Sequence, residues 1–148
     1  MAYSNGLAAY RQTRIKTAGQ GQLIIMLYDG AVKNLDLAID LLKTGSGVQR
    51  KAANIEKISK AVLKAQEIVT ELSVSLDFEQ GGEIARNLFS LYTWFNKELL
   101  EASVSSDVTR ITAVRAMIHD LRGAWLEIIA RTTADERAGA PAGISLAG

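Results

Sequence analysis

Apolar side chains recur along most of the chain at spacings of three and four residues, which is the period of an α-helix with one buried face. The pattern is clearest over residues 55–76 and is repeated over residues 84–99 and 111–128. It selects the stripe positions Ile55, Ile58, Val62, Ala65, Val69, Leu72 and Leu76, then Ile84, Leu88, Leu91, Phe95 and Leu99, and finally Ile111, Val114, Ile118, Leu121, Trp125 and Ile128. Three helices of this kind need a fourth helix to close a core.

The fourth stripe comes first in the chain, in a helix expected from about Gln20 to Thr44. Its positions are Leu23, Leu27, Ala31, Leu35, Ala38 and Leu42. The only proline is Pro141, so no earlier position is excluded from a helix by the proline ring. Short turns are expected at residues 44–47, at Gly81-Gly82 after Asp77, and at residues 103–107, where Ser105, Ser106 or Asp107 could cap the next helix. Because short connections force neighbouring helices to run antiparallel, the sequence predicts an all-α fold, an antiparallel up-down four-helix bundle.

The two ends of the chain differ from this bundle in composition. We expect a short N-terminal helical cap segment at residues 1–16, the bundle at residues 17–131, and a flexible Ala/Gly-rich C-terminal tail at residues 132–148. Leu7 and Tyr10 are spaced three apart in an otherwise polar stretch, which suits a helical turn that covers an apolar groove and can be removed. A frayed terminus with incidental apolar residues fits the same pattern equally well.

Two of the expected helices carry more apolar surface than one stripe requires. Residues 23–28 (LIIMLY) place bulky groups around the whole circumference of a helix. Residues 88–95 (LFSLYTWF) hold four of the nine aromatic residues of the chain. A helix that touches two neighbours needs a wide apolar arc, but an excess strip is also typical of a groove for another amphipathic helix. The candidates for such a binding surface are Leu7, Tyr10, Ile24, Leu27, Tyr28, Phe89, Tyr92 and Trp94. Among them, Ile24, Tyr28 and Trp94 are expected to face away from the core.

Composition narrows the possible functions. With 17 Lys and Arg against 16 Asp and Glu, the chain has no net field that would attract nucleic acid. It has no cysteine and one histidine, which excludes disulfides and thiol chemistry and makes a histidine-rich metal site improbable. Asp29 has no histidine or second acid at a useful spacing. We therefore expect no catalytic residue, no metal site and no cofactor. No signal peptide and no apolar run of about 20 residues is present, so we expect a cytoplasmic protein without membrane insertion.

Several segments resemble the flagellar export chaperone family FliS. They are Tyr10, the stretch LIIMLYDGA at residues 23–31, AQEI at residues 65–68, GGEIARNL at residues 81–88, and LRGAW at residues 121–125. These segments occur in the family's order between Tyr10 and Arg131, which covers nearly all of the expected bundle. One departure is Gly19-Gln20-Gly21, which stands where the family usually begins the helix with Ser-Pro-Glu.

The resemblance implies that the protein is a chaperone, not an enzyme, and that its client is the C-terminal segment of flagellin. The family holds this segment in an extended wrap of short helices against apolar grooves, which prevents premature polymerisation and keeps the client competent for export. The resemblance also places the segment around Tyr10 near the binding surface. The flagellar export apparatus or a regulatory protein would be further partners.

A different function is suggested by residues 119–123 (HDLRG), which resemble the phosphoacceptor motif of histidine phosphotransfer domains. Such a domain needs an exposed imidazole with a cation nearby, and His119 with Arg122 one turn later could supply both. The motif is short and leaves the other matching segments unexplained. The alternative to the phosphotransfer function is that His119 is an ordinary surface residue on an amphipathic helix.

Overall fold

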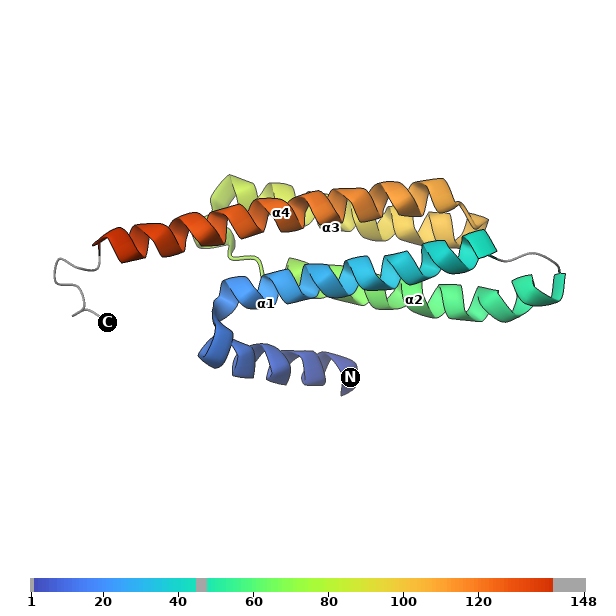
Figure 1. Ribbon diagram of the computed structural model, residues 1–148, viewed down its shortest axis with the longest axis horizontal. Coiled ribbons are helices and arrows are strands. Elements are labelled where there is room, and N and C mark those ends of the chain that lie inside the picture. The colour runs from blue at the N-terminus through green and yellow to red at the C-terminus, as the bar shows by residue number, and fades with distance from the viewer. Residues whose placement is uncertain (1, 45–47, 140–148) are drawn as a thin grey trace. The chain divides into compact units, whose positions relative to one another are not determined.

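The computed structural model of the chain is helical (Figure 1). It describes the backbone of residues 2–44 and 48–139 and the side chains of residues 20–44 and 54–132. These ranges contain four helices and no strand. The helices are α1 (Ala2–Thr44), α2 (Val48–Val74), α3 (Phe78–Ser105) and α4 (Val108–Gly139). The predicted all-α, four-helix fold is confirmed.

The first and last helices are longer than the sequence pattern predicted. α1 begins at Ala2 and includes the segment that we expected to form a separate short helix. α4 continues past Arg131 to Gly139. Glycine inside a helix costs only about 1 kcal/mol relative to alanine, so Gly19 and Gly21 weaken α1 without ending it. The tail after Gly139 lies outside the described residues, and the expected division at residues 16 and 131 remains a prediction.

The chain separates into two compact units. The central unit is Met26–His119, and the terminal unit combines Met1–Ile25 with Asp120–Gly148. Within the central unit, the Ile68 side chain of α2 lies close to Gly30 of α1, because a Cβ atom added to Gly30 would be 3.1 Å from Ile68 Cδ1. Hydrogen bonds connect α1 with α3 and α4, and α3 with α2 and α4. The bonded pairs are Tyr28 with Tyr92, Asp36 with Arg115, Gln66 with Asn96, and Glu98 with Arg110. The central unit is therefore a four-helix bundle (Figure 1). Most of the turn expected at residues 44–47 lies outside the described residues.

Apolar side chains from all four helices form the core of the central unit. The buried residues are Leu27, Tyr28, Ala31, Leu35, Ala38, Ile58, Ala61, Val62, Ala65, Ile68, Val69, Leu72, Ala85, Tyr92, Phe95, Leu99, Ala102, Ile111, Val114 and Ile118. Most of the predicted stripe positions are among them. Ile55 and Ile84 are not, because both are exposed near the beginning of a helix. A residue at the end of a stripe can extend beyond the side chains of the neighbouring helices.

The turn predicted at Gly81-Gly82 occurs earlier in the chain, because α2 ends at Val74 and α3 begins at Phe78, and Gly82 lies inside α3. Oδ1 of Asp77 accepts hydrogen bonds from the backbone N–H groups of Glu79 and Gln80, both at 3.0 Å, and so caps the first helical turn. Gly82 then adopts φ 50° and ψ −124°, which bends the chain within α3. This conformation is open to glycine and strained for residues with a Cβ atom.

The turn between α3 and α4 shows which of Ser105, Ser106 and Asp107 caps the last helix. Ser106 is left-handed, with φ 55°, and the N–H of Asp107 donates to the carbonyl of Ala102 at 2.9 Å. Oδ1 of Asp107 accepts a hydrogen bond from the N–H of Arg110 at 3.2 Å. Asp107 is therefore the N-terminal cap of α4.

The terminal unit shows why a glycine occurs at position 21. A Cβ atom added to Gly21 would lie 2.8 Å from two carbon atoms of the Ile129 side chain. Glycine at this position therefore allows the close approach of Ile129. Leu23 and Ile25 are buried, as their apolar character suggests, whereas Ile128, which was predicted on the stripe of α4, is exposed.

Candidate functional site

The structure contradicts the expected outward orientation of Tyr28. Tyr28 has no exposed surface and Tyr92 is 2% exposed, and their phenol hydroxyls share a hydrogen bond between α1 and α3. Leu27 is also buried. Tyr28 joins the core because α1 contacts several helices at once, so the buried arc of α1 covers two adjacent positions of the sequence. The proposed role of these three residues in binding is not tested by their burial.

Three other candidates have different environments. Phe89 is 46% exposed and Trp94 is 42% exposed, so the outward orientation expected for Trp94 is confirmed. Ile24, in the terminal unit, is half-buried, not fully exposed. The side chains of Leu7 and Tyr10 lie outside the described residues, so their cover function remains a prediction.

Phe89 and Trp94 occupy different sides of α3. They are five residues apart, which places them about 140° apart around the helix axis. Phe89 packs edge-on against Phe78 with ring centroids 5.9 Å apart, and Trp94 packs against the buried Phe95, also at 5.9 Å. Each exposed aromatic ring is thus held in place by a second ring, and the two rings present separate surfaces.

A further apolar surface extends along the outside of α2 and α3. On α2, Leu63 and Val74 are 54% and 67% exposed, and on α3, Phe89 and Leu100 are 46% and 58% exposed. Residues spaced by 7 and 11 positions lie within about 20° of one another on a helix. Leu63, Thr70 and Val74 have this spacing and therefore share one face of α2. Phe89, Asn96 and Leu100 have the same spacing and share one face of α3. We call Leu63, Val74, Phe89 and Leu100 the α2–α3 strip.

A polar bridge lies in the middle of the α2–α3 strip. Nδ2 of Asn96 donates a hydrogen bond to the Thr70 hydroxyl at 3.1 Å, and Nε2 of Gln66 donates to the backbone carbonyl of Asn96 at 3.0 Å. Because α2 and α3 run antiparallel, Leu63 and Leu100 lie on one side of this bridge, and Val74 and Phe89 lie on the other. The strip therefore has two apolar ends and a polar centre.

Ion pairs fix α4 against its neighbours in the central unit. The Arg110 guanidinium donates to both carboxylate oxygens of Glu98, at 2.7 and 2.9 Å, and to Glu101 at 3.0 Å. The hydrogen bond from Arg110 lowers the pKa of Glu98, and the same pairing raises the pKa of Arg110. Arg115 pairs with Asp36 at 2.8 Å, and this hydrogen bond raises the pKa of Arg115. These pairs position α4 against α1 and α3.

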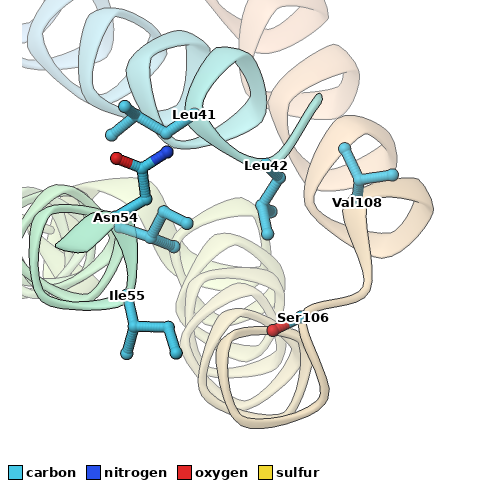
Figure 2. A pocket seen from close by; sticks show the side chains of 7 residues that line it. Leu41, Leu42, Asn54, Ile55, Ser106 and Val108 are labelled. Atoms are coloured by element: carbon cyan, nitrogen blue, oxygen red, sulfur yellow. The ribbon is translucent and has the colours of Figure 1, made fainter. Parts of the chain in front are cut away.

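A cavity of about 360 Å³ lies at one end of the central unit (Figure 2). It is bounded by the end of α1, the beginning of α2, the turn after α3 and the beginning of α4. The described lining residues are Leu41, Leu42, Asn54, Ile55, Ile58, Ser106 and Val108. None of them carries an ionisable side chain, so this part of the lining supplies neither a general acid nor a general base.

Other chemical functions find little support within residues 20–44 and 54–132. No group of three His, Asp or Glu side chains in this part of the chain could hold a metal ion. None of the described helices is long and apolar enough to cross a membrane. His119 is exposed, as both a phosphoacceptor and an ordinary surface residue would be. Exposure alone does not separate these two interpretations.

The central unit belongs to the class of four-helix bundles, and it leaves large apolar side chains exposed on α2 and α3. Comparison with known proteins then identifies the family. Residues 3–132 match the family described as Flagellar protein FliS. The chain belongs to the FliS family of flagellar secretion chaperones, which makes it a chaperone of flagellar assembly and not a member of an enzyme family.

Curated relatives agree with this assignment. The chain is 34% identical to the flagellar secretion chaperone FliS of Salmonella typhimurium over 140 residues, which cover 92% of this chain and 98% of the relative. It is 33% identical to the Escherichia coli FliS over 131 residues, covering 86% and 91%. It is 29% identical to the Bacillus subtilis FliS over 129 residues, covering 87% and 90%. The family match accounts for nearly the whole chain, whereas the phosphotransfer motif accounts for five residues.

The sequence analysis missed Leu63, Val74 and Leu100 as surface candidates. Leu63 and Leu100 each follow a buried stripe residue, Val62 and Leu99 respectively, and neither belongs to a predicted stripe. The repeated spacing of 7 and 11 positions in two consecutive helices is the signal that could have identified them.

Proposed function

We propose that the protein binds the C-terminal segment of unassembled flagellin in the cytoplasm. This binding prevents premature polymerisation and keeps flagellin competent for export. Contact with the export apparatus or with a regulatory protein would follow at a later step. Membership of the FliS family supports a flagellar client, and the α2–α3 strip supports a client that is held through apolar contacts.

The single observation that carries the proposal is the exposure of the α2–α3 strip. Four large apolar side chains on two adjacent helices remain exposed, although the core beneath them is complete. An amphipathic helix laid along this strip would cover these side chains with its own apolar face. Truncation of the central anchors in such an interface typically costs about 1 kcal/mol or more of binding free energy each.

The mechanism follows from the nature of the client. The terminal helices of flagellin pack against other copies in a filament, so a free subunit exposes amphipathic segments that associate too early. Covering one of these segments blocks that association. A client bound in extended form has no compact fold to lose before export, and the ordering of the client reduces the net affinity enough to permit release.

The expected site residues then have three roles. Phe89 and Trp94 are exposed and would contact the client directly, and Ile24 would contribute from the terminal unit. Leu27, Tyr28 and Tyr92 would support the surface from the core. Leu7 and Tyr10 would cover an apolar groove until the client displaces them.

A pull-down with two forms of the cognate flagellin tests the proposal. Full-length flagellin should be retained by the immobilised protein, and flagellin without its C-terminal segment should not. A flagellin with an equally long deletion in its central region serves as a control and should still be retained. Equal retention of all three forms would exclude the C-terminal segment as the client site.

A further inference from the structure

The first turn of α3 folds back against the helix that it begins. Gly82, with φ 50° and ψ −124°, has a non-helical conformation inside α3 and separates residues 78–81 from the rest of the helix. The bend is tight, because a Cβ atom added to Gly81 would lie 2.8 Å from Cβ of Ala85. In a straight helix, Cβ atoms four residues apart are separated by about 5–6 Å. The bend at Gly82 therefore presses the first turn onto the turn that follows it.

Two aromatic rings meet because of this bend. Phe78 and Phe89 are eleven residues apart, so a straight helix would separate them by about 16 Å along its axis. In the structure their ring centroids are 5.9 Å apart and the rings pack edge to face. This geometry is a favourable one for aromatic pairs. The contact between the two rings therefore holds the first turn in its folded-back position.

The same segment is also compatible with a straight helix. Eleven residues correspond to about 1,100° of rotation, which is about 20° more than three whole turns, so Phe78 and Phe89 would share one face of a straight α3. The cap formed by Asp77 would remain, because its hydrogen bonds from the N–H groups of Glu79 and Gln80 are local to the first turn. Straightening would cost the ring contact but would remove the unusual conformation of residue 82.

We propose that residues 78–81 form a lid with two positions. In the closed position, which the structure shows, the lid folds back at Gly82 and Phe78 covers part of the Phe89 ring. In the open position, the lid continues α3 as a straight helix and uncovers that ring. Only the closed position requires glycine at residue 82, because a residue with a Cβ atom is strained at a φ of 50°. The lid controls the accessible area of Phe89, and this inference does not depend on the identity of the client.

A distance measurement along α3 tests the two positions directly. The chain has no cysteine, so Glu79→Cys on the lid and Lys97→Cys on the body of α3 would give two unique sites for spin labels. Both positions are exposed. They are 18 residues apart, so a straight helix would place their backbones about 27 Å apart on one face. The closed lid should give a shorter distance, and pulsed electron spin resonance on the full chain would resolve the two populations.

Variants in the labelled chain should shift the populations in a defined way. Gly82→Ala strains the closed position and Phe78→Ala removes the ring contact, so each should raise the population near 27 Å by at least about threefold. Adding Phe89→Ala to Phe78→Ala should cause no further shift, because both replacements remove the same contact. Ile84→Ala is the matched control, since Ile84 is also a large exposed residue of α3, and it should leave the distances unchanged. Circular dichroism would confirm that each variant is folded.

Every other outcome overturns the lid. An unchanged short distance in Gly82→Ala or in Phe78→Ala would show that the bend is fixed or that the ring contact does not hold it. A broad distribution of distances without a peak near 27 Å would show a frayed turn, not a second helical position. A single distance near 27 Å in the chain with neither replacement would show that the closed position is not the populated one.

Discussion

The hydroxyls of Tyr28 and Tyr92 share a hydrogen bond inside the core, between helices whose bonded residues are 64 positions apart in the sequence. The bond fixes the position of α1 relative to α3 in a way that apolar packing alone would not. Tyrosine also brings a large ring to the core, so each residue combines a packing role with a directional one.

The Tyr28–Tyr92 bond should be visible in a double-mutant cycle. Tyr28→Phe and Tyr92→Phe should each lower the free energy of unfolding by about 0.5–1.5 kcal/mol or more. The double variant should lose less than the sum of the two, because the second replacement removes a bond that the first has already broken. Chemical denaturation of the four proteins measures this, and strict additivity would show that the bond makes no separate contribution.

Phe95 and Phe89 should separate stability from binding. Phe95 is fully buried, so Phe95→Ala should lower the free energy of unfolding by about 3–5 kcal/mol through the cavity it leaves. Phe89→Ala should cost much less stability and weaken binding of the flagellin segment by about 1 kcal/mol or more. Thermal melts paired with titrations decide the matter. Normal client binding by a folded Phe89→Ala variant would remove Phe89 from the proposed surface.

Gly82 should be the glycine that tolerates alanine least for conformational reasons. Its φ of 50° and ψ of −124° are strained for a residue with a Cβ atom, so Gly82→Ala should lower the free energy of unfolding by about 1–3 kcal/mol. The space around it is open, which excludes a steric explanation. Gly123→Ala is the matched control in α4, where the space is also open, and it should raise stability by about 0.4–1 kcal/mol. Equal effects of the two replacements on the melting temperature would contradict the conformational argument.

The Glu98–Arg110 pair should make stability depend on pH in the acid range. Because the pKa of Glu98 is lowered in the folded protein, the pair stabilises the fold above the ordinary glutamate pKa, and this contribution disappears as pH falls through the lowered value. The difference in melting temperature between the unaltered protein and Arg110→Gln should therefore be largest near neutral pH and shrink toward about pH 3. Lys60→Gln removes only an exposed pair with Glu56, and it should show a small difference throughout. A constant difference for Arg110→Gln across this range would rule out the linkage.

The helical period was sufficient to predict the number of helices, and most of the core was predicted with it. Of the turns, the one at residues 103–107 was predicted where it occurs, between α3 and α4. The helical period could not predict the width of each buried arc, because that depends on how many helices a given helix touches. Tyr28 was placed outside for this reason, although it is one residue from the stripe position Leu27. Leu63 was not among the predicted surface residues, although it is 54% exposed on α2.

The polar details of the surface depend on three-dimensional contacts that a one-dimensional pattern does not contain. Asn96 reads as an ordinary helix residue in the sequence, and only its position opposite Thr70 reveals a hydrogen bond between α2 and α3. Gly21 likewise appeared to mark the beginning of a helix. Its actual constraint is the Ile129 side chain, which lies more than a hundred positions later in the chain.

The angle of about 140° between Phe89 and Trp94 has a mechanical consequence for any client that engages both. A single straight helix cannot reach both sides of α3, so such a client must bend and make two contacts joined by a linker. Each contact alone is weak and opens often, while the other raises the local concentration of the released part and favours its return. Pulling on one end of the client would therefore break the two contacts one after the other. The two contacts would not have to be broken at the same moment.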